Sequence, residues 1–210
     1  IPWREELLKM NVPIVIIDRE IEESNEFDYV GVNNKEASCR GVEYLINLGH
    51  RRIGILIGIG RLKSFQQRLE GYLEALKKHK IPIDEDLIIY SPERTIEAAQ
   101  ETIQKLFLSN IPLPTALFCT NNLMSLGTII AAKKNNIMIP QQLSVLGFDD
   151  FDWSDALNPP LTAISQPTYT IGSTAAQILL RRIARGRLMP KQRVIIDVQL
   201  TVRESCKKIN

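Results

Sequence analysis

This sequence is poor in the residues that build disulfide scaffolds and metal clusters. Its 210 residues include only two histidines and three cysteines, and Cys39, Cys119 and Cys206 are widely spaced. An odd number of cysteines at that spacing excludes a disulfide framework, and no metal-ligand spacing is present. We therefore expect a reduced protein that holds no metal and no cofactor.

Long apolar runs and a strong charge of one sign are also absent. The longest uninterrupted apolar stretch, Ile53–Gly60, is too short to cross a bilayer. Lys and Arg number 26 against 24 Asp and Glu, which is typical neither of disorder nor of an autonomous nucleic-acid binder. The residues after Ile1 lack the basic and apolar regions of a secretory signal. We expect a soluble globular protein without a membrane partner. Because it begins without Met, we expect a fragment or a processed product.

Recognisable catalytic motifs are missing too. No Gly-x-Ser-x-Gly motif or phosphate loop occurs, and Gly58-Ile59-Gly60 lacks the third glycine of the dinucleotide fingerprint. His79 lies in a basic run that predicts a solvated helix end, and His50 follows a helix stop at Gly49, which is typical of a structural turn residue. The set of nucleophile, base and orienting group is not filled, so the sequence predicts no enzyme and no catalytic residue.

The chain does contain a regular alternation of short strands and amphipathic helices. The strands are continuous apolar runs, as in Val12–Ile17 and Ile53–Ile57, which is typical of a parallel sheet covered on both faces. The sequence therefore predicts a doubly wound α/β protein. The predicted strands are 12–17, 29–32, 53–57, 87–90, 115–120, 143–147, 161–165 and 194–202, and the predicted helices begin at Asn34, Ser64, Thr95, Leu123 and Tyr169.

One helix start carries a specific signal. Ser64-Phe65-Gln66-Gln67 has the spacing of a capping box, in which Ser64 accepts from an amide of the first turn and Gln67 reaches back. The helix that it opens is predicted to bury Phe65, Leu69, Leu73 and Leu76.

Polar side chains follow five of the predicted strands, and ligands bind at the carboxyl ends of strands in open parallel sheets. Carboxylates, an amide, guanidinium groups and an aromatic ring together suit a polyhydroxylated ligand. The alternative is that the Asn and Asp pairs are helix caps and turn residues, and that Arg68 is a solvated surface group. The groups after the strands are Asp18-Arg19, Arg61 to Arg68, Tyr90-Ser91, Asn121-Asn122 and Asp149-Asp150.

A further set of stretches, in order along essentially the whole chain, matches one family. They are Val12–Arg19, Gly49–Gly54, Arg68–Tyr72 with Ala75-Leu76, Phe118–Asn121 with Gly127, Ile139-Pro140, Val145–Asp150, Asn158–Thr162 and Gln166-Pro167. On these residues the chain resembles the effector-binding core of the lactose/galactose repressor (LacI/GalR) family of bacterial transcription regulators. The resemblance implies a type I periplasmic-binding-protein-like fold of two doubly wound parallel-sheet subdomains, with the effector in the cleft between them.

The resemblance also implies the division of the chain and the site. The N-subdomain would be 1–33 and 164–195, lacking its first part, and the C-subdomain 34–163 and 196–210; the DNA-binding headpiece is absent. Asp18 and Arg19 would contact the effector from the N-subdomain. From the C-subdomain, the contacts would be Ser64, Arg68, Asn121, Asp149 and, near the family's ring-stacking position, Tyr90.

Two departures and two open interpretations accompany the resemblance. Asn122 stands where the family usually has Asp, and Arg61 and Lys63, with Arg19 and Arg68, would suit an acidic sugar. Phe151 and Trp153 fall where the family places part of its dimer contact, or else they pin their own loop to the core. A run of basic residues near the C-terminus is either a solvated helix end or an aid to attracting the phosphates of DNA. It comprises Arg181, Arg182, Arg185, Arg187, Lys191 and Arg193.

The function that the resemblance implies is that of a cytoplasmic sensor domain of a LacI-type regulator, a repressor. A sugar, sugar acid or sugar phosphate would bind in the cleft and control operator DNA binding by the missing headpiece, within a homodimer. The alternative is a periplasmic or extracytoplasmic sugar-binding protein of similar fold, which a secretion signal upstream of Ile1 would favour.

Overall fold

The computed structural model describes residues 2–10, 12–19, 26–60, 62–185 and 190–209, and the chain divides into two compact units. Unit 1 comprises residues 1–32 and 167–197, and unit 2 comprises residues 33–166 and 198–210. The units therefore divide after residues 32, 166 and 197, where the resemblance places subdomain boundaries after 33, 163 and 195. No helix among the described residues is long and apolar enough to span a membrane.

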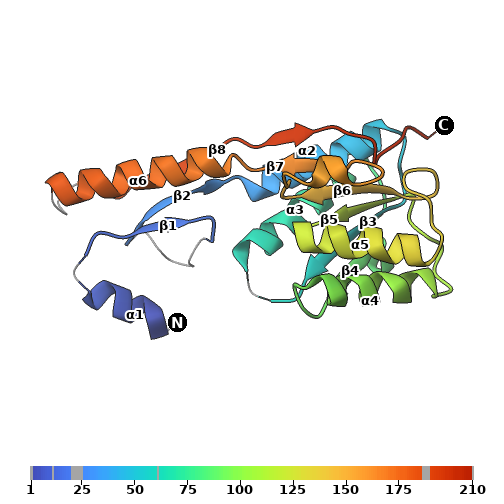
Figure 1. The fold of residues 1–210 in the computed structure, drawn as a ribbon, viewed down its shortest axis with the longest axis horizontal. Helices are drawn as coiled ribbons and strands as arrows, with labels where there is room; N and C mark the ends of the chain where they lie inside the picture. The colour runs from blue at the N-terminus through green and yellow to red at the C-terminus, as the bar shows by residue number, and fades with distance from the viewer. Residues whose placement is uncertain (1, 11, 20–25, 61, 186–189, 210) are drawn as a thin grey trace. The chain divides into compact units, whose positions relative to one another are not determined.

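Unit 2 contains a six-stranded sheet in the order β4-β3-β5-β6-β7-β9, parallel throughout except for the antiparallel pair β7-β9 (Figure 1). Its strands are β3 (Ile53–Gly58), β4 (Ile88–Ser91), β5 (Ala116–Cys119), β6 (Ser144–Phe148), β7 (Thr162–Ser165) and β9 (Gln199–Thr201). Its helices are α2 (Asn34–Asn47), α3 (Lys63–Lys78), α4 (Ile96–Phe107) and α5 (Asn122–Lys134), with 3-10 turns at Glu85–Leu87 and Ser154–Ala156. Helices α2 and α3 pack together, as do α4 and α5.

The continuous apolar runs of the sequence become the fully buried strands of this sheet. Every residue of β3, β5 and β6 is buried, because helices cover both faces. The predicted doubly wound α/β fold is therefore confirmed. The core between the sheet and the helices α4 and α5 includes Leu56, Ile103, Leu117 and Val145, all almost wholly removed from solvent.

Unit 1 is smaller, with a three-stranded parallel sheet in the order β1-β2-β8. The strands are β1 (Val15–Ile17), β2 (Asp28–Val32) and β8 (Arg193–Ile196), and the helices are α1 (Pro2–Lys9) and α6 (Thr168–Arg185). Helix α6 packs on β1 and β2. Its Arg182 is 3% exposed and donates two 2.7 Å hydrogen bonds to the carboxylate of Asp28, which is also buried.

The basic run is therefore not simply a solvated helix end. That interpretation is wrong for Arg182, because its charge is neutralised by Asp28 across the α6–β2 contact. Arg193 also contacts its own unit, with its guanidinium 4.6 Å from the centre of the Tyr29 ring. Arg181 is exposed, whereas Arg187 and the side chain of Arg185 lie outside the described residues.

The predicted strand 194–202 is wrong, because the segment forms two strands in two different sheets. Strand β8 extends the sheet of unit 1 beside β2, and β9 pairs antiparallel with β7 in unit 2. The chain passes from one unit to the other between Asp197 and Val198. A continuous β-branched pattern carries no mark of such a change of sheet, and helix α1 was likewise not predicted.

The capping box at Ser64 is also wrong. Helix α3 begins at Lys63 with Leu62 as its N-cap, so Ser64 already lies within the first turn and no side chain caps the helix. The buried face is rotated as well, since Leu69 and Leu73 are only half-buried. The reason is the close approach of α2 at Gly71, where an added Cβ would lie 2.1 Å from the Lys35 carbonyl oxygen.

Candidate functional site

The candidate site lies at the carboxyl edge of the unit 2 sheet, where the ends of β4, β3, β5, β6 and β7 follow one another. At the middle of this edge is Arg68 of α3, which is 4% exposed. Its Nε donates to the Asn34 side-chain oxygen at 2.8 Å, one terminal nitrogen donates to the Thr120 carbonyl at 2.5 Å, and its guanidinium lies 3.6 Å from the centre of the Phe148 ring. The interpretation of Arg68 as a solvated surface group is therefore wrong.

Asp149, the first residue after β6, is held in an unusual conformation. Its φ is 71°, in the left-handed region that Asp and Asn tolerate better than other non-glycine residues. Its backbone N–H donates to the Ile164 carbonyl at 2.9 Å, and Gln166 Nε2 donates to its Oδ1 at 2.5 Å. The other oxygen lies 3.5 Å from an Arg68 nitrogen, while the side chain keeps 26% exposure. The carboxylate is thus fixed in position but still open to a ligand.

Asn121 has a structural role that the alternative interpretation anticipated. It is the N-cap of α5, and its side-chain oxygen accepts from the Met124 N–H at 2.8 Å. Asn122 accepts from the N–H of Leu123 at 2.7 Å. These hydrogen bonds occupy one acceptor of each side chain, and both residues follow β5, the strand next to β6 in the sheet.

Unit 2 contains two more of the predicted site residues, Tyr90 and Ser64. Tyr90 is the third residue of the edge strand β4 and is 51% exposed, which leaves its ring available for stacking. Ser64 is half-buried in the first turn of α3. Among the described residues, no hydrogen bond or ion pair joins either of them to Arg68 or Asp149.

Asp18 and Arg19 belong to unit 1, where they follow β1. Asp18 also has a positive φ, 61°, and its backbone is held by the Tyr29 hydroxyl and by the Val30 carbonyl. Its Oδ1 is buried and has no hydrogen-bond partner in the part of the chain that the structure describes. Because a buried carboxylate oxygen without a donor costs stability, it is a candidate acceptor for a ligand hydroxyl. Arg19 is exposed.

The loop that follows Asp149 in unit 2 carries the two aromatic residues of the predicted dimer contact. The rings of Phe151 and Trp153 stack with centroids 4.5 Å apart and an interplanar angle of 19°. Trp153 keeps 38% exposure. Just before them, Asp150 forms two 3.0 Å hydrogen bonds with Arg203, so its carboxylate serves to anchor the loop.

Sequence reasoning missed three residues that build this edge: Gln166, Asn34 and Phe148. Gln166 directly follows the predicted strand 161–165, so the rule that selected the other strand ends would have selected it as well. Phe148 and Asn34 also follow predicted strands, 143–147 and 29–32, but their contact with Arg68 joins segments that are distant in sequence, so position along the chain does not reveal it. The described residues include no group of three or more His, Cys, Asp or Glu that would hold a metal ion.

Comparison with known proteins yields one family and many relatives. The family described as periplasmic binding protein-like domain matches residues 42–206. The chain is 33% identical over 199 residues to a probable HTH-type transcriptional repressor, ExuR, of Bacillus subtilis, covering 95% of this chain and 59% of that protein. The chain therefore spans about three fifths of the length of this curated relative. The relatives named here and below are transcriptional regulators rather than enzymes.

The chain is also similar to solved structures of transcriptional regulators. The putative LacI transcriptional regulator of Bacillus cereus subsp. cytotoxis is similar with a TM-score of 0.90 and 28% identity, over 99% of this chain and 72% of that one. A complex of the transcriptional regulator CelR with cellobiose is similar with a TM-score of 0.88 and 29% identity, over 97% of this chain and 62% of that one.

Proposed function

This chain belongs to the family of periplasmic binding protein-like domains, as the effector-binding core of a LacI-type protein, and from that premise we propose that it senses a small sugar-like molecule. In the longer protein, this ligand controls operator DNA binding by a separate DNA-binding domain. The relatives support the proposal by their names, which are those of transcriptional repressors and regulators. A catalytic reaction forms no part of the proposal.

The observation that carries the proposal is the fixed, partly exposed carboxylate of Asp149. A carboxylate can accept hydrogen bonds from two vicinal hydroxyl groups, which is the pattern that a sugar presents. Gln166 and Arg68 orient it before the ligand arrives, so that little ordering is left to be done on binding. The exposed ring of Tyr90 would cover an apolar sugar face at the same edge.

The ligand class follows from how Arg68 is used. Its contacts with Asn34, Thr120 and Asp149 make it a positioning group for the carboxylate. Hydroxyl recognition is therefore the main chemistry that we propose. Recognition of an acidic group on the sugar would depend on Lys63 and Arg19, because Arg61 lies outside the described residues. That recognition stays a prediction, as do contacts of Ser64 and Asn121 with the ligand. The contact of Asp18 with the ligand is likewise a prediction.

The site is tested by calorimetric titration of the chain with cellobiose, ribose, glucuronate and glucose 6-phosphate. For the sugar that binds, Asp149→Asn should weaken affinity at least tenfold, because hydrogen bonds to a charged acceptor contribute about 1.5–3 kcal/mol. Asn keeps the shape of the side chain and tolerates the positive φ. Asp152→Asn, which removes an exposed charge from the following loop, is the matched control and should leave affinity unchanged. Equal affinity in both variants would place the ligand elsewhere.

The regulatory role is tested in the full-length protein. We expect it to bind DNA from its own promoter region and the sugar to change that affinity, measured by fluorescence anisotropy. The alternative function, extracytoplasmic sugar binding, predicts a secretion signal upstream of Ile1 and no DNA binding. A homodimer in the cytoplasm is part of the regulatory proposal, and sedimentation of Trp153→Ser against wild type tests whether the exposed Trp153 contributes to it.

A further inference from the structure

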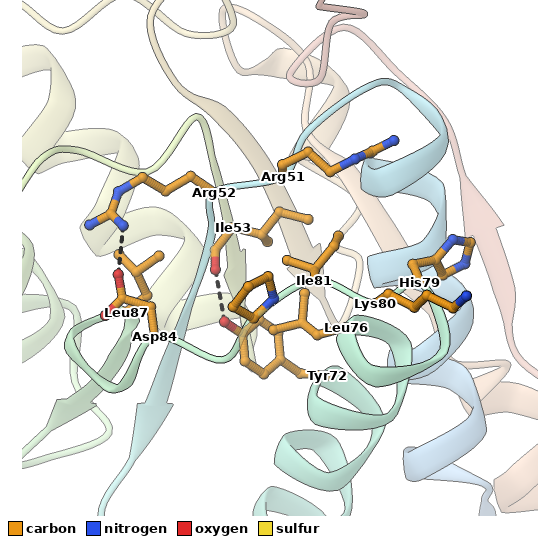
Figure 2. Close-up of a pocket in the computed structure, with 11 residues that line it drawn as sticks. Arg51, Arg52, Ile53, Tyr72, Leu76, His79, Lys80, Ile81, Asp84 and Leu87 are labelled. Carbon is orange, nitrogen blue, oxygen red and sulfur yellow. Dashed lines mark hydrogen bonds and ion pairs between the residues drawn. The ribbon is translucent and has the colours of Figure 1, made fainter.

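A cavity of about 500 Å³ lies at the opposite edge of the unit 2 sheet from the candidate site (Figure 2). Ile53, the first residue of β3, and Leu87, which immediately precedes β4, lie on its wall, so it opens at the amino edge of the strands. The volume falls within the range of about 300–1,000 Å³ that small-molecule sites occupy. The site at the carboxyl edge does not use any of its residues.

The floor of this cavity is apolar and firmly built. Ile53, Leu76, Ile81 and Leu87 are each at most 9% exposed. Tyr72 is also buried, its hydroxyl donates to the Ile53 carbonyl at 2.8 Å, and burial raises the pKa of the phenol, so the ring remains neutral. A ligand that enters would meet preformed apolar walls, which suits a compact hydrocarbon or ring body.

The mouth of the cavity is basic. In Figure 2 the side chains of Arg51 and Arg52 diverge on opposite sides of Ile53, and His79 and Lys80 lie toward the side of Arg51. The charge of Arg52 is compensated by Asp84, to which it donates at 2.5 Å.

Arg51 and Lys80 supply the uncompensated charge. One Arg51 nitrogen donates to the carbonyls of Ile46 and His50 at 2.9 and 3.0 Å, which fixes the side chain at the end of α2. Within the described part of the chain, neither Arg51 nor Lys80 has a carboxylate within 4.0 Å. Two cations beside an apolar floor are complementary to an anionic group attached to an apolar body.

We propose that this cavity is a second ligand site, which binds a small organic anion with an apolar body through Arg51 and Lys80. This site does not depend on the sugar-binding proposal, because the two lie at opposite edges of the sheet and share no residue. The anionic group is a sulfonate, carboxylate or phosphate, since each offers the acceptor oxygens that the two cations need.

The test is a fluorescence titration of the chain with 8-anilinonaphthalene-1-sulfonate, which carries a sulfonate on an apolar ring system. We expect saturable binding to the wild type and an affinity at least tenfold lower in the double variant Arg51→Glu/Lys80→Glu. The matched control is Lys105→Glu/Lys133→Glu, which makes the same charge change at exposed positions on α4 and α5 and should stay within twofold of wild type.

Binding that is absent from the wild type, or equal in the double variant and the wild type, would overturn the proposal. Circular dichroism checks that each variant is folded. If the double variant fails to fold, Lys80→Asn takes its place, because Asn accepts the φ of 56° found at this position. That variant should weaken binding at least threefold, and an unchanged affinity would again overturn the site.

Discussion

Among the residues that the structure describes, each unit contains one buried arginine that faces a carboxylate, and the two pairs differ in how much of the carboxylate is exposed. In unit 1, Arg182 and Asp28 are 3% and 1% exposed in their side chains and share two 2.7 Å hydrogen bonds. In unit 2, Arg68 is just as buried, but its nitrogen lies 3.5 Å from a carboxylate of Asp149 that keeps 26% exposure.

The difference lies in the other partners of each arginine. Arg182 directs its donors to Asp28 and to the Pro190 carbonyl, and the Gln192 N–H also donates to Asp28, so the carboxylate is sealed into the structure. Arg68 instead donates at short distance to Asn34 and Thr120, which anchors the guanidinium independently of Asp149. An arginine and a carboxylate therefore form a closed structural pair in unit 1, whereas in unit 2 they leave a partly exposed carboxylate at the edge where we propose that a ligand binds.

The largest effect on stability is expected on breaking the Arg182–Asp28 pair. Arg182→Met leaves the charge of Asp28 buried without its partner, which should lower the free energy of unfolding by about 3–5 kcal/mol. Urea unfolding measures the loss. Its exposed neighbour provides the control, since Arg181→Met should change stability by less than about 0.5 kcal/mol. Similar small losses in both variants would show that the buried pair is not structural.

Removing Arg68 from the Arg68–Asp149 pair should destabilise the fold as well, but by less. Arg68→Met removes the donors to Asn34 and Thr120 while it keeps an apolar contact with Phe148, and we expect a loss of about 2–3 kcal/mol in the same urea experiment. A variant as stable as wild type would mean that Arg68 serves the ligand alone.

Acid should weaken the Arg182–Asp28 pair, with a smaller effect on stability than the substitutions above. Burial by itself would raise the pKa of Asp28, but the hydrogen bonds from Arg182 and the Gln192 N–H outweigh it and hold the pKa below its usual 3.8. Since the folded pKa is the lower one, the pair contributes its full stability above pH 3.8 and loses it as the pH falls through the folded pKa. Asp28→Asn should therefore show a shallower loss of stability below pH 4 than wild type. Parallel pH profiles would contradict this account.

The smallest effect on stability is expected at the open carboxylate. Asp149→Asn keeps the hydrogen bond from Gln166 and the positive φ, so the free energy of unfolding should change by less than about 0.5 kcal/mol. Combined with a tenfold loss of sugar affinity, this result would separate a binding residue from a structural one. A loss of stability comparable to that of Arg182→Met would erase the distinction between the two pairs.

Much of unit 2 could be predicted from the sequence because its strands are buried on both faces. Runs such as Ile53–Ile57 can bury all their apolar side chains only in a strand that is covered on both faces. The helices between them are predicted by the spacing of their apolar residues. Prediction failed where a local pattern fits two structures equally well. Residues 194–202 suit one long strand or two short ones, and Ser64 fits the N-cap position only if the helix begins two residues later than it does.

The candidate site shows the same limit. The rule that ligands meet strand ends selected Asp149 and Arg68, and the structure brings these two together. It could not assign their roles, because Arg68 on an amphipathic helix looks like a surface residue until Phe148 and Asn34 enclose it. The cavity beside Arg51 and Lys80 has no signature in the sequence, since it is formed where α3 and the segments that precede β3 and β4 come together.

The sequence by itself determined the alternation of elements, the parallel sheet of unit 2 and the polar groups at its carboxyl edge, because these depend on residues close together in the chain. The tertiary structure alone decided which charges are sealed and which remain available. Arg182 and Asp28 are 154 residues apart, and Arg68 and Asn34 are 34 apart. Whether a charge is neutralised depends on the groups that surround it in space, and the local pattern of the chain does not contain that information.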